Sequence, residues 1–202
     1  MRRGIIFCFA GPSGSGKTTL SEMFRRKSNG SVSRITTVTT RAPRSGEVDG
    51  IDYHFWSEDY FRFALRDDLF FEHEKVHGNM YGTLSSSLEQ VVTDRKMSLI
   101  ILDVNGAIKL KNKFPDDVVN VFLTCSHRSE LRRRIEERNT APEDLTRRLN
   151  AAALELDIYK ANVDKFDYLI VNDDLNVSWT VLSNIATHEG VKRGDVFRFA
   201  DE

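Results

Sequence analysis

The 202-residue sequence has only two cysteines and four prolines, and no hydrophobic run is long enough to cross a membrane. Cys8 and Cys125 both lie in apolar, strand-like stretches, so neither a disulfide framework nor a cysteine metal site is expected. The apolar run near the N-terminus is too short for a signal peptide. These absences predict a protein of the reducing cytoplasm that does not bind membranes.

Net charge is nearly absent as well, because 29 lysines and arginines face 30 acidic residues and leave a formal charge of -1. A nonspecific nucleic-acid binder carries a surplus of basic residues on one surface, so no nucleic-acid partner is expected. With 40% hydrophobic and 29% charged residues, the composition favours a folded chain. Its length suits one globular unit, or a core with an inserted subdomain.

A glycine-rich loop is the most informative feature that is present. Residues 11–18 read GPSGSGKT, after an apolar segment at 5–10 and before a helical pattern at 18–27. In this setting backbone N–H groups converge on a phosphate, and the helix N-terminus adds partial positive charge. The alternative is a flexible Gly/Ser turn, but the full motif predicts a nucleoside triphosphate site. The expected ATP contacts in the loop are Gly11, Pro12, Ser13, Gly14, Ser15, Gly16, Lys17, Thr18 and Thr19.

Three side chains of this motif have separate predicted tasks. Lys17 is expected to bridge the β- and γ-phosphates. The hydroxyl of Thr18 is expected to ligate Mg²⁺, which makes Mg²⁺ the predicted cofactor, and Thr19 adds a second hydroxyl near the phosphates.

The pattern of apolar segments predicts an α/β fold. Strand-like runs at 5–10, 98–102, 118–124 and 168–171 are mostly separated by helical patterns. This alternation predicts a parallel sheet flanked by helices, of the P-loop NTPase type. The expected helices are 18–27, 57–66 with Ser57 as N-cap, 130–137 and 143–162.

Two regions differ in character from this core. Residues 37–94 are rich in aromatic and turn residues and predict a small mixed subdomain inserted into the core. Residues 126–148 are rich in arginine. The predicted domain spans about 1–190, with a core of about 1–36, 95–125 and 149–190, and is followed by a tail at 191–202. The phenylalanines of the tail are expected to pack on the core or on a partner subunit. A homo-oligomer is therefore one of the alternatives.

Three further segments resemble the guanylate kinases. They are residues 37–53 (TVTTRAPRSGEVDGIDY), 71–83 (FEHEKVHGNMYGT) and 166–174 (FDYLIVNDD), and with the phosphate loop they extend the resemblance over about 4–189. The resemblance implies an ATP:GMP phosphotransferase of purine nucleotide metabolism, with ATP and GMP or dGMP as its small-molecule partners. It also implies that residues 126–148 form a lid over ATP.

The residue types suit a GMP site for chemical reasons too. The guanidinium groups of Arg41 and Arg44 can grip a phosphate dianion through paired hydrogen bonds, and Tyr53 and Tyr81 can add hydroxyl donors. A carboxylate at Glu72 can accept from the adjacent N1–H and 2-amino groups of guanine, which adenine lacks, giving discrimination on the order of 10⁴. The complete GMP site implied by the resemblance is Thr37, Arg41, Arg44, Tyr53, Glu72, Tyr81, Thr83 and Asp103.

The lid and the adenine end complete the implied site. Arginines from a closing segment would stabilise the charge on the transferred phosphoryl group and exclude water. Asn172 and Asp173 match the family's approach to adenine, although such a pair is also typical of an ordinary turn. The catalytic set is Lys17, Arg44, Arg134, Arg138 and Arg148, and Arg138 and Asn172 also belong to the ATP site.

The sequence departs from the family pattern in two places. The family usually has two acids at the end of the central strand, whereas only Asp103 is present. Ungapped counting makes Asp103 the guanine-facing acid and puts Ile101 at the position nearer the metal; a gapped alignment makes Asp103 the first acid and Asn105 the second. The lid reads ERNT at 137–140 instead of Gly-Arg-Gly, which restricts the backbone. Catalysis slower than usual for the family is expected.

Two other functions stay open. A kinase for a phosphorylated sugar would share the phosphate loop and the arginine lid but not the guanine-reading residues. A noncatalytic guanylate-kinase-like module would bind proteins, usually within a longer chain and with a degraded phosphate loop.

Overall fold

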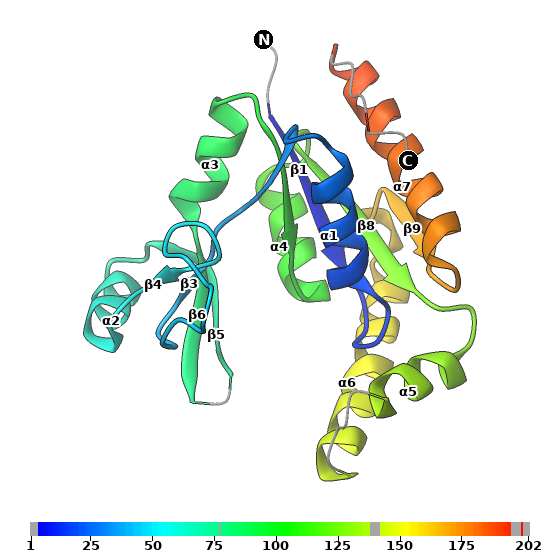
Figure 1. The fold of residues 1–202 in the computed structure, drawn as a ribbon, viewed down its shortest axis with the longest axis horizontal. Helices are drawn as coiled ribbons and strands as arrows, with labels where there is room; N and C mark the ends of the chain where they lie inside the picture. Colours follow the sequence, from blue (N-terminus) through cyan, green and yellow to red (C-terminus); the bar gives the residue numbers. More distant parts are fainter. Residues whose placement is uncertain (1–3, 77, 138–141, 195–198, 200–202) are drawn as a thin grey trace.

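The protein is built on a five-stranded sheet in which every strand is parallel to its neighbours (Figure 1). The computed structural model describes residues 4–76, 78–137, 142–194 and 199. The strands follow the order β2-β7-β1-β8-β9. Their bounds are β1 Ile5–Ala10, β2 Val32–Arg34, β7 Met97–Ile101, β8 Val118–Thr124 and β9 Tyr168–Val171. The predicted P-loop NTPase architecture is therefore confirmed.

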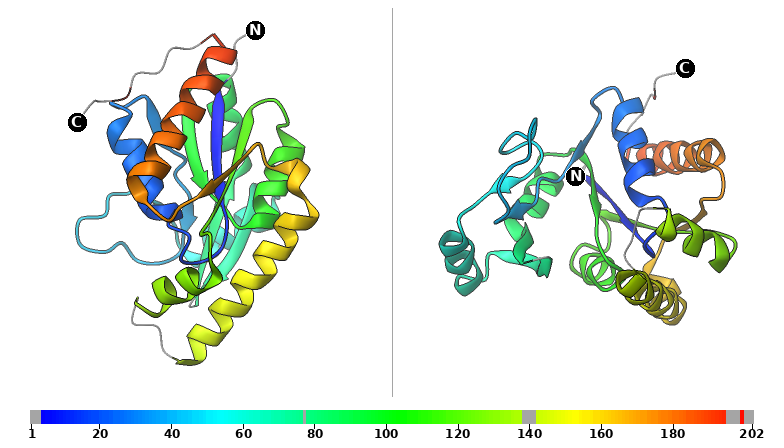
Figure 2. Two further views of the ribbon diagram at one scale, coloured as in Figure 1. Left: turned by 90° about the vertical axis from the view of Figure 1, so that its right-hand side faces the viewer. Right: turned by 60° about the horizontal axis from the view of Figure 1, so that its bottom comes forward.

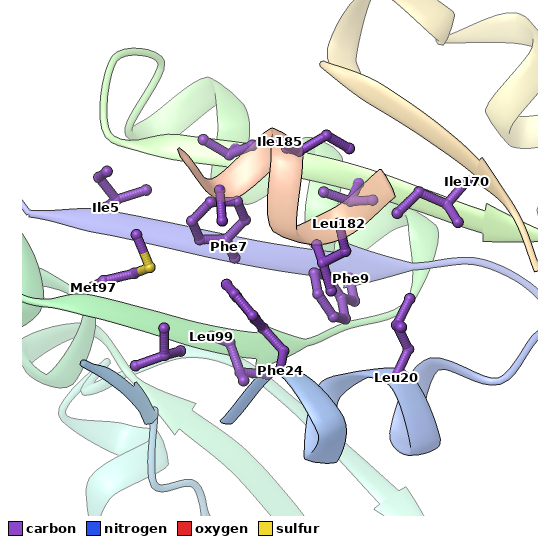
Figure 3. Packing of buried hydrophobic residues seen from close by; sticks show 14 of the residues in the cluster. Ile5, Phe7, Phe9, Leu20, Phe24, Met97, Leu99, Ile170, Leu182 and Ile185 are labelled. Carbon is purple, nitrogen blue, oxygen red and sulfur yellow. The ribbon is translucent and has the colours of Figure 1, made fainter. Parts of the chain in front are cut away.

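The central strand β1 is buried on both faces, because alternate side chains enter two different hydrophobic clusters. Helices α1 (Lys17–Lys27) and α7 (Leu175–Lys192) cover one face, while α3 (Ser85–Thr93) and α4 (Val104–Lys113) cover the other. Phe24 of α1 lies at the centre of the first cluster, with its ring 5.3 Å from that of Phe7. Figure 3 shows this cluster, which includes Ile5, Phe7, Phe9, Leu20, Phe24, Leu182 and Ile185.

The first sheet contains one strand that the sequence pattern did not predict. Strand β2 has three residues, and two of them, Ser33 and Arg34, are exposed. So short a strand offers no run of apolar residues and no clear alternation. It nevertheless pairs with β7 and forms one edge of the sheet.

A second, four-stranded sheet lies beside the first (Figure 1). Its order is β4-β3-β6-β5; β3 and β4 are parallel, and the other two pairs are antiparallel. Helix α2 (Glu58–Arg66) packs on it, and the Ser57 hydroxyl accepts a hydrogen bond from the Tyr60 backbone N–H, as expected of an N-cap. The strands are β3 Val38–Thr39, β4 His54–Phe55, β5 Phe70–Val76 and β6 Asn79–Leu84.

The apolar side chains of helix α3 pack on the first sheet, although the predicted boundary near residue 94 assigned this helix to the inserted subdomain. Leu88, Val91 and Val92 belong to the cluster beneath the first sheet. The second sheet itself ends at Leu84. The apolar spacing of α3 identifies a helix but not the sheet on which it packs.

The arginine-rich region consists of α5 (Arg128–Glu136) and the long helix α6 (Pro142–Ala161), which lie side by side at the bottom of Figure 1. Figure 2 shows α6 extending diagonally along the molecule. The predicted bounds, 130–137 and 143–162, differ from these by one or two residues. A short helix, η1 (Val163–Lys165), then leads to β9.

Phe199, near the C-terminus, lies against the core. The ring of Phe199 lies 5.8 Å from Phe24 and 5.4 Å from Trp179, so it extends the first cluster. For Phe199 this agrees with packing on the core, one of the two alternatives expected for the tail phenylalanines, whereas Phe197 is outside the described residues. None of the described helices combines the length and apolarity needed to cross a bilayer.

Candidate active site

The phosphate loop connects the end of β1 to the start of α1, as the sequence predicts. Its glycines are required by backbone geometry: φ is 139° at Gly11 and 89° at Gly16. A Cβ atom would lie 2.0 Å from the Leu123 carbonyl oxygen at Gly11, and 2.2 Å from Asn172 Nδ2 at Gly16. No larger residue fits either position without displacing its neighbours.

The polar side chains of this loop are held in place or presented to the surface. Lys17 Nζ donates to the carbonyl oxygens of Gly11 and Pro12, and the second of these distances is 3.0 Å. Thr18 and Thr19 are exposed at the start of α1. The Ser15 hydroxyl is buried without a hydrogen-bond partner in the described structure. The loop therefore presents one ammonium group and two hydroxyl groups at the N-terminus of a helix, an arrangement suited to polyphosphate.

A cavity of about 550 Å³ lies between the phosphate loop and the second sheet, and residues of both line it. Its volume lies in the range of small-molecule sites. It is lined by Gly11, Lys17 and Thr18 and, from the predicted GMP set, by Thr37, Tyr53, Glu72, Tyr81, Thr83 and Asp103. Arg34, Glu74 and Glu155 also line it, and the sequence analysis did not single out any of these three.

Glu72 and Thr83 form the first polar pair of this cavity. They are register partners on β5 and β6, and Thr83 Oγ1 donates to Glu72 Oε1 at 2.6 Å. Because this hydrogen bond fixes the carboxylate, its remaining lone pairs are available to donors that enter the cavity.

Asp103 follows β7 and caps α4. Its Oδ1 accepts from the Gly106 backbone N–H at 2.6 Å. Both Ile101 and Asp103 line the cavity, whereas Asn105 does not. In the ungapped comparison, Ile101 occupies the position of the first acid and Asp103 that of the second.

The two arginines predicted to clamp the acceptor phosphate are organised by Glu47, a residue that the sequence analysis gave no role. Arg41 donates to both oxygens of Glu47, each at 2.9 Å, and this pair is only 15% and 20% exposed. The carboxylate also accepts from the Arg44 backbone N–H at 2.7 Å. Hydrogen bonding by Arg41 and then by Arg44 lowers the pKa of Glu47. The Arg44 side chain is exposed, and neither arginine lines the cavity.

The ring of Tyr53 links Arg41 to the cavity. The Arg41 guanidinium lies 5.4 Å from the centre of this ring, and the ring itself lies 6.1 Å from that of Tyr81. A side-chain hydrogen bond that Arg41 donates to the Tyr81 oxygen contributes, after Glu47, to raising the pKa of Arg41. The predicted phosphate end of the acceptor site is therefore a connected set of tyrosine and arginine side chains.

Glu155 of α6 is an acidic group in this cavity that the sequence analysis missed. Its Oε2 is buried and has no hydrogen-bond partner among the described residues. Burial raises its pKa to about 7; nearby Lys17 opposes this shift and Asp103 adds to it. The available signal was spacing: Glu155 follows Arg148 by seven residues, nearly two turns, so both lie on one side of α6.

A second pocket, of about 350 Å³, lies next to the phosphate loop near Asn172. Asn172 Nδ2 donates to the Ser15 carbonyl oxygen at 2.8 Å. Arg134 donates to the carbonyl oxygens of Asn172 and Asp173, at 2.8 and 3.3 Å, and to Glu130 at 2.6 Å. Gly14, Gly16, Thr19, Arg134, Glu137, Asn172, Asp173 and Leu175 line the pocket.

The arginines predicted for the lid do not lie together at one pocket in the described structure. Arg134 lies at the pocket predicted for adenine, and not in the cavity of Glu72. Arg148 is partly buried in α6, while Arg138 lies outside the described residues. Arg133 and Arg134 together lower the pKa of Glu130 to about 2, so this carboxylate holds both guanidinium groups over a wide pH range.

The donor set of the larger cavity fits a magnesium ion that arrives with a nucleotide. Mg²⁺ is usually held by one or two protein groups together with substrate phosphates and water. Thr18 supplies a hydroxyl, and Glu155 has a buried carboxylate oxygen without a partner. Within the described ranges, no three His, Cys, Asp or Glu side chains are grouped so that they could hold a metal ion by themselves.

A phosphate loop at the carboxyl end of β1 in a parallel sheet, lining a polar cavity, defines a P-loop protein with a P-loop NTPase α/β fold. The family model described as guanylate kinase matches residues 1–189. The chain belongs to the guanylate kinase family.

Individual relatives agree with this assignment. The guanylate kinase of Clostridium perfringens (strain 13) is 37% identical over 86% of this chain and 78% of the relative. That of Bartonella henselae is 36% identical over 97% and 86%. The crystal structure of guanylate kinase from Anaplasma phagocytophilum superposes with a TM-score of 0.66, at 31% identity, over 93% of this chain and 87% of that chain.

Proposed function

We propose that the protein transfers the γ-phosphoryl group of ATP, bound with Mg²⁺, to GMP or dGMP, giving ADP and GDP or dGDP. The observation that carries this proposal is a single cavity that contains both Lys17 and Thr18 of the phosphate loop and the hydrogen-bonded pair of Glu72 and Thr83. A donor polyphosphate and an acceptor nucleotide would meet in this cavity.

Recognition of guanine rests on acceptors placed opposite donors. Glu72, held by Thr83, accepts from N1–H and the 2-amino group, and Asp103 supplies a second carboxylate in the same cavity. Thr37 lines the cavity as well, and we assign its hydroxyl to the guanine base. AMP is rejected because adenine has an acceptor at N1, which offers the Glu72 carboxylate no donor.

The acceptor phosphate binds at the end formed by Tyr53, Tyr81 and Arg41. Two nitrogens of Arg41 donate to Glu47, and one of them also donates to the Ala42 carbonyl oxygen. These bonds hold the guanidinium in one orientation and leave other N–H groups for the phosphate. Arg44 is placed beside it by the same carboxylate and completes the clamp when the second sheet closes over the nucleotide.

Phosphoryl transfer then depends on position and charge. Lys17 leaves the loop carbonyl oxygens for the β- and γ-phosphates, and Thr18 and Glu155 are the residues that would hold Mg²⁺. When bound, Mg²⁺ neutralises charge that builds up on the phosphate oxygens. The attacking oxygen belongs to an ionised phosphate, so the protein supplies no general base. Arg134, Arg138 and Arg148 close over ATP and exclude water, and Asn172 adjoins the adenine.

The setting that suits this activity is the cytoplasm, where both substrates are found and thiols stay reduced. Burial raises the pKa of both cysteine thiols, which suits structural and unreactive cysteines at positions 8 and 125. The partners of the protein are small molecules, and neither nucleic acid nor a membrane is required.

A coupled assay of ADP release with GMP, dGMP, AMP, CMP, UMP and a sugar phosphate tests the proposal. Turnover confined to GMP and dGMP is expected. Equal turnover of AMP would remove the role of Glu72, and turnover of the sugar phosphate alone would favour a sugar kinase. Binding of GMP without any ADP release would favour a noncatalytic module.

A further inference from the structure

Glu74 is a carboxylate in the acceptor cavity that the proposed reaction does not use. It lies two residues after Glu72 on β5, and both line the cavity. Residues two apart on a strand share one face, and they are separated by about 7 Å. The same strand therefore presents two acidic acceptors to one ligand, one step apart.

The pairing of β5 with β6 shows what each acceptor lies beside. Glu72 is opposite Thr83, and Glu74 is opposite Tyr81. Opposite residues of an antiparallel pair point to the same side of the sheet. The pair of Glu72 and Thr83 lies at the end of the cavity assigned to the base. In the next pair, Tyr81 contacts Arg41, which is assigned to the acceptor phosphate. Glu74 is thus one step from the base end toward the phosphate end, where a nucleotide has its ribose.

The carboxylate of Glu74 has no ion pair and accepts no side-chain hydrogen bond from any residue in the described part of the chain. Burial raises its pKa, and repulsion from Glu72 and then from Asp103 adds to the shift. An acceptor that lines the cavity among like charges gains most from a ligand that brings a donor.

The donors of GMP are few. They are N1–H and the 2-amino group on the base, and the 2′- and 3′-hydroxyls on the ribose. Glu72 and Asp103 take the base donors, so a third carboxylate is left with the ribose. The 2′-hydroxyl is the ribose donor nearest the base, and Glu74 is the acceptor next to the pair of Glu72 and Thr83. Carboxylates bind this hydroxyl in other nucleotide sites for the same reason.

We propose that Glu74 accepts a hydrogen bond from the 2′-hydroxyl of GMP and makes the protein select GMP over dGMP. This inference rests on the proposed function. It assigns Glu74 to sugar recognition, separate from the base and phosphate contacts.

The test compares kcat/KM for GMP, dGMP and 3′-deoxy-GMP in the wild type, Glu74→Ala and Glu74→Gln, with binding of GMP and dGMP measured by calorimetry. The wild type is expected to prefer GMP over dGMP by about 10- to 100-fold, the range for a hydrogen bond to a charged group. Glu74→Ala should lose this factor with GMP and 3′-deoxy-GMP but leave dGMP unchanged. Glu74→Gln keeps one acceptor and should fall between.

Glu89→Ala, which removes a carboxylate outside the cavity, is the matched control and should keep the wild-type ratio. Equal use of GMP and dGMP by the wild type, or an equal loss for both in Glu74→Ala, would overturn the inference. So would a loss specific to the 3′-hydroxyl. If the wild type binds neither nucleotide, the proposed function itself fails, and the two failures are therefore distinguishable.

Discussion

Thr83 Oγ1 donates to Glu72 Oε1 at 2.6 Å across the pairing of β6 and β5. The hydroxyl has one proton, and using it here fixes which lone pairs of the carboxylate face the cavity. The base-reading group is therefore oriented before any ligand enters, which reduces the ordering that binding requires.

Thr83→Val keeps the shape of the side chain and removes this donor. We expect kcat/KM for GMP to fall by about 10-fold, from loss of one hydrogen bond to a charged group, with the KM for ATP unchanged.

Glu72→Gln should have a larger effect on kcat/KM for GMP, of about 100-fold, because the amide N–H group would face the N–H donors of guanine. Steady-state kinetics with each substrate varied in turn measures both. Thr93→Val, at the end of α3, is the control, and an unchanged KM for GMP in Glu72→Gln would contradict the assignment.

Lys17→Ala should abolish turnover while GMP still binds, because the ammonium group acts on the donor phosphates and the acceptor site is built by other elements. Calorimetry with GMP and a single-turnover assay with ATP provide the two measurements. Lys27→Ala, at the other end of α1, removes a lysine whose ammonium lies 5.4 Å from the centre of the Trp179 ring and should keep its activity. Retained turnover in Lys17→Ala would contradict the phosphate-loop mechanism.

Glu47→Ala should raise the KM for GMP by about 10-fold without changing the KM for ATP. The reason is that Arg41 loses the two hydrogen bonds that orient its guanidinium, and the Arg44 backbone loses its acceptor. Glu58→Ala breaks a comparable but exposed pair with Arg62 on α2 and should change neither constant. Unaltered GMP kinetics in Glu47→Ala would show that the orientation of Arg41 does not matter for the acceptor.

Glu155 predicts a pH dependence of stability. Its pKa is about 7 in the folded protein and near 4.5 in the unfolded chain. Between these values the folded state binds more protons, so Glu155 makes the free energy of unfolding fall as pH rises from about 4.5 to 7. Glutamine does not ionise, so Glu155→Gln should not lose this part of the free energy of unfolding as pH rises. Above pH 7 the variant should be more stable than the wild type by on the order of 1 kcal/mol, after allowance for solvent screening.

Urea unfolding of both proteins at pH 5 and pH 8 measures this difference. The variant should gain stability relative to the wild type only at the higher pH. An equal difference at both pH values would show that the carboxylate is not held in the environment that the structure describes.

The sequence predicts the core sheet well because its strands are continuous apolar runs and its phosphate loop has fixed spacing. It could not predict β2, whose three residues include two exposed ones, nor the packing of α3 on the first sheet, which depends on contacts between distant segments. Six of the eight predicted GMP residues meet in one cavity. Glu47, Glu74 and Glu155 were missed because isolated acidic residues carry no signal until the fold brings them beside the site.

Calorimetric titration of the wild-type protein with GMP, IMP and AMP tests most directly whether adjacent donors on guanine are read by a carboxylate. The account predicts clear binding of GMP, binding of IMP that is weaker by about 10- to 100-fold because IMP lacks the 2-amino donor, and no measurable binding of AMP. An absence of heat with GMP, or equal affinities for GMP and AMP, would contradict it.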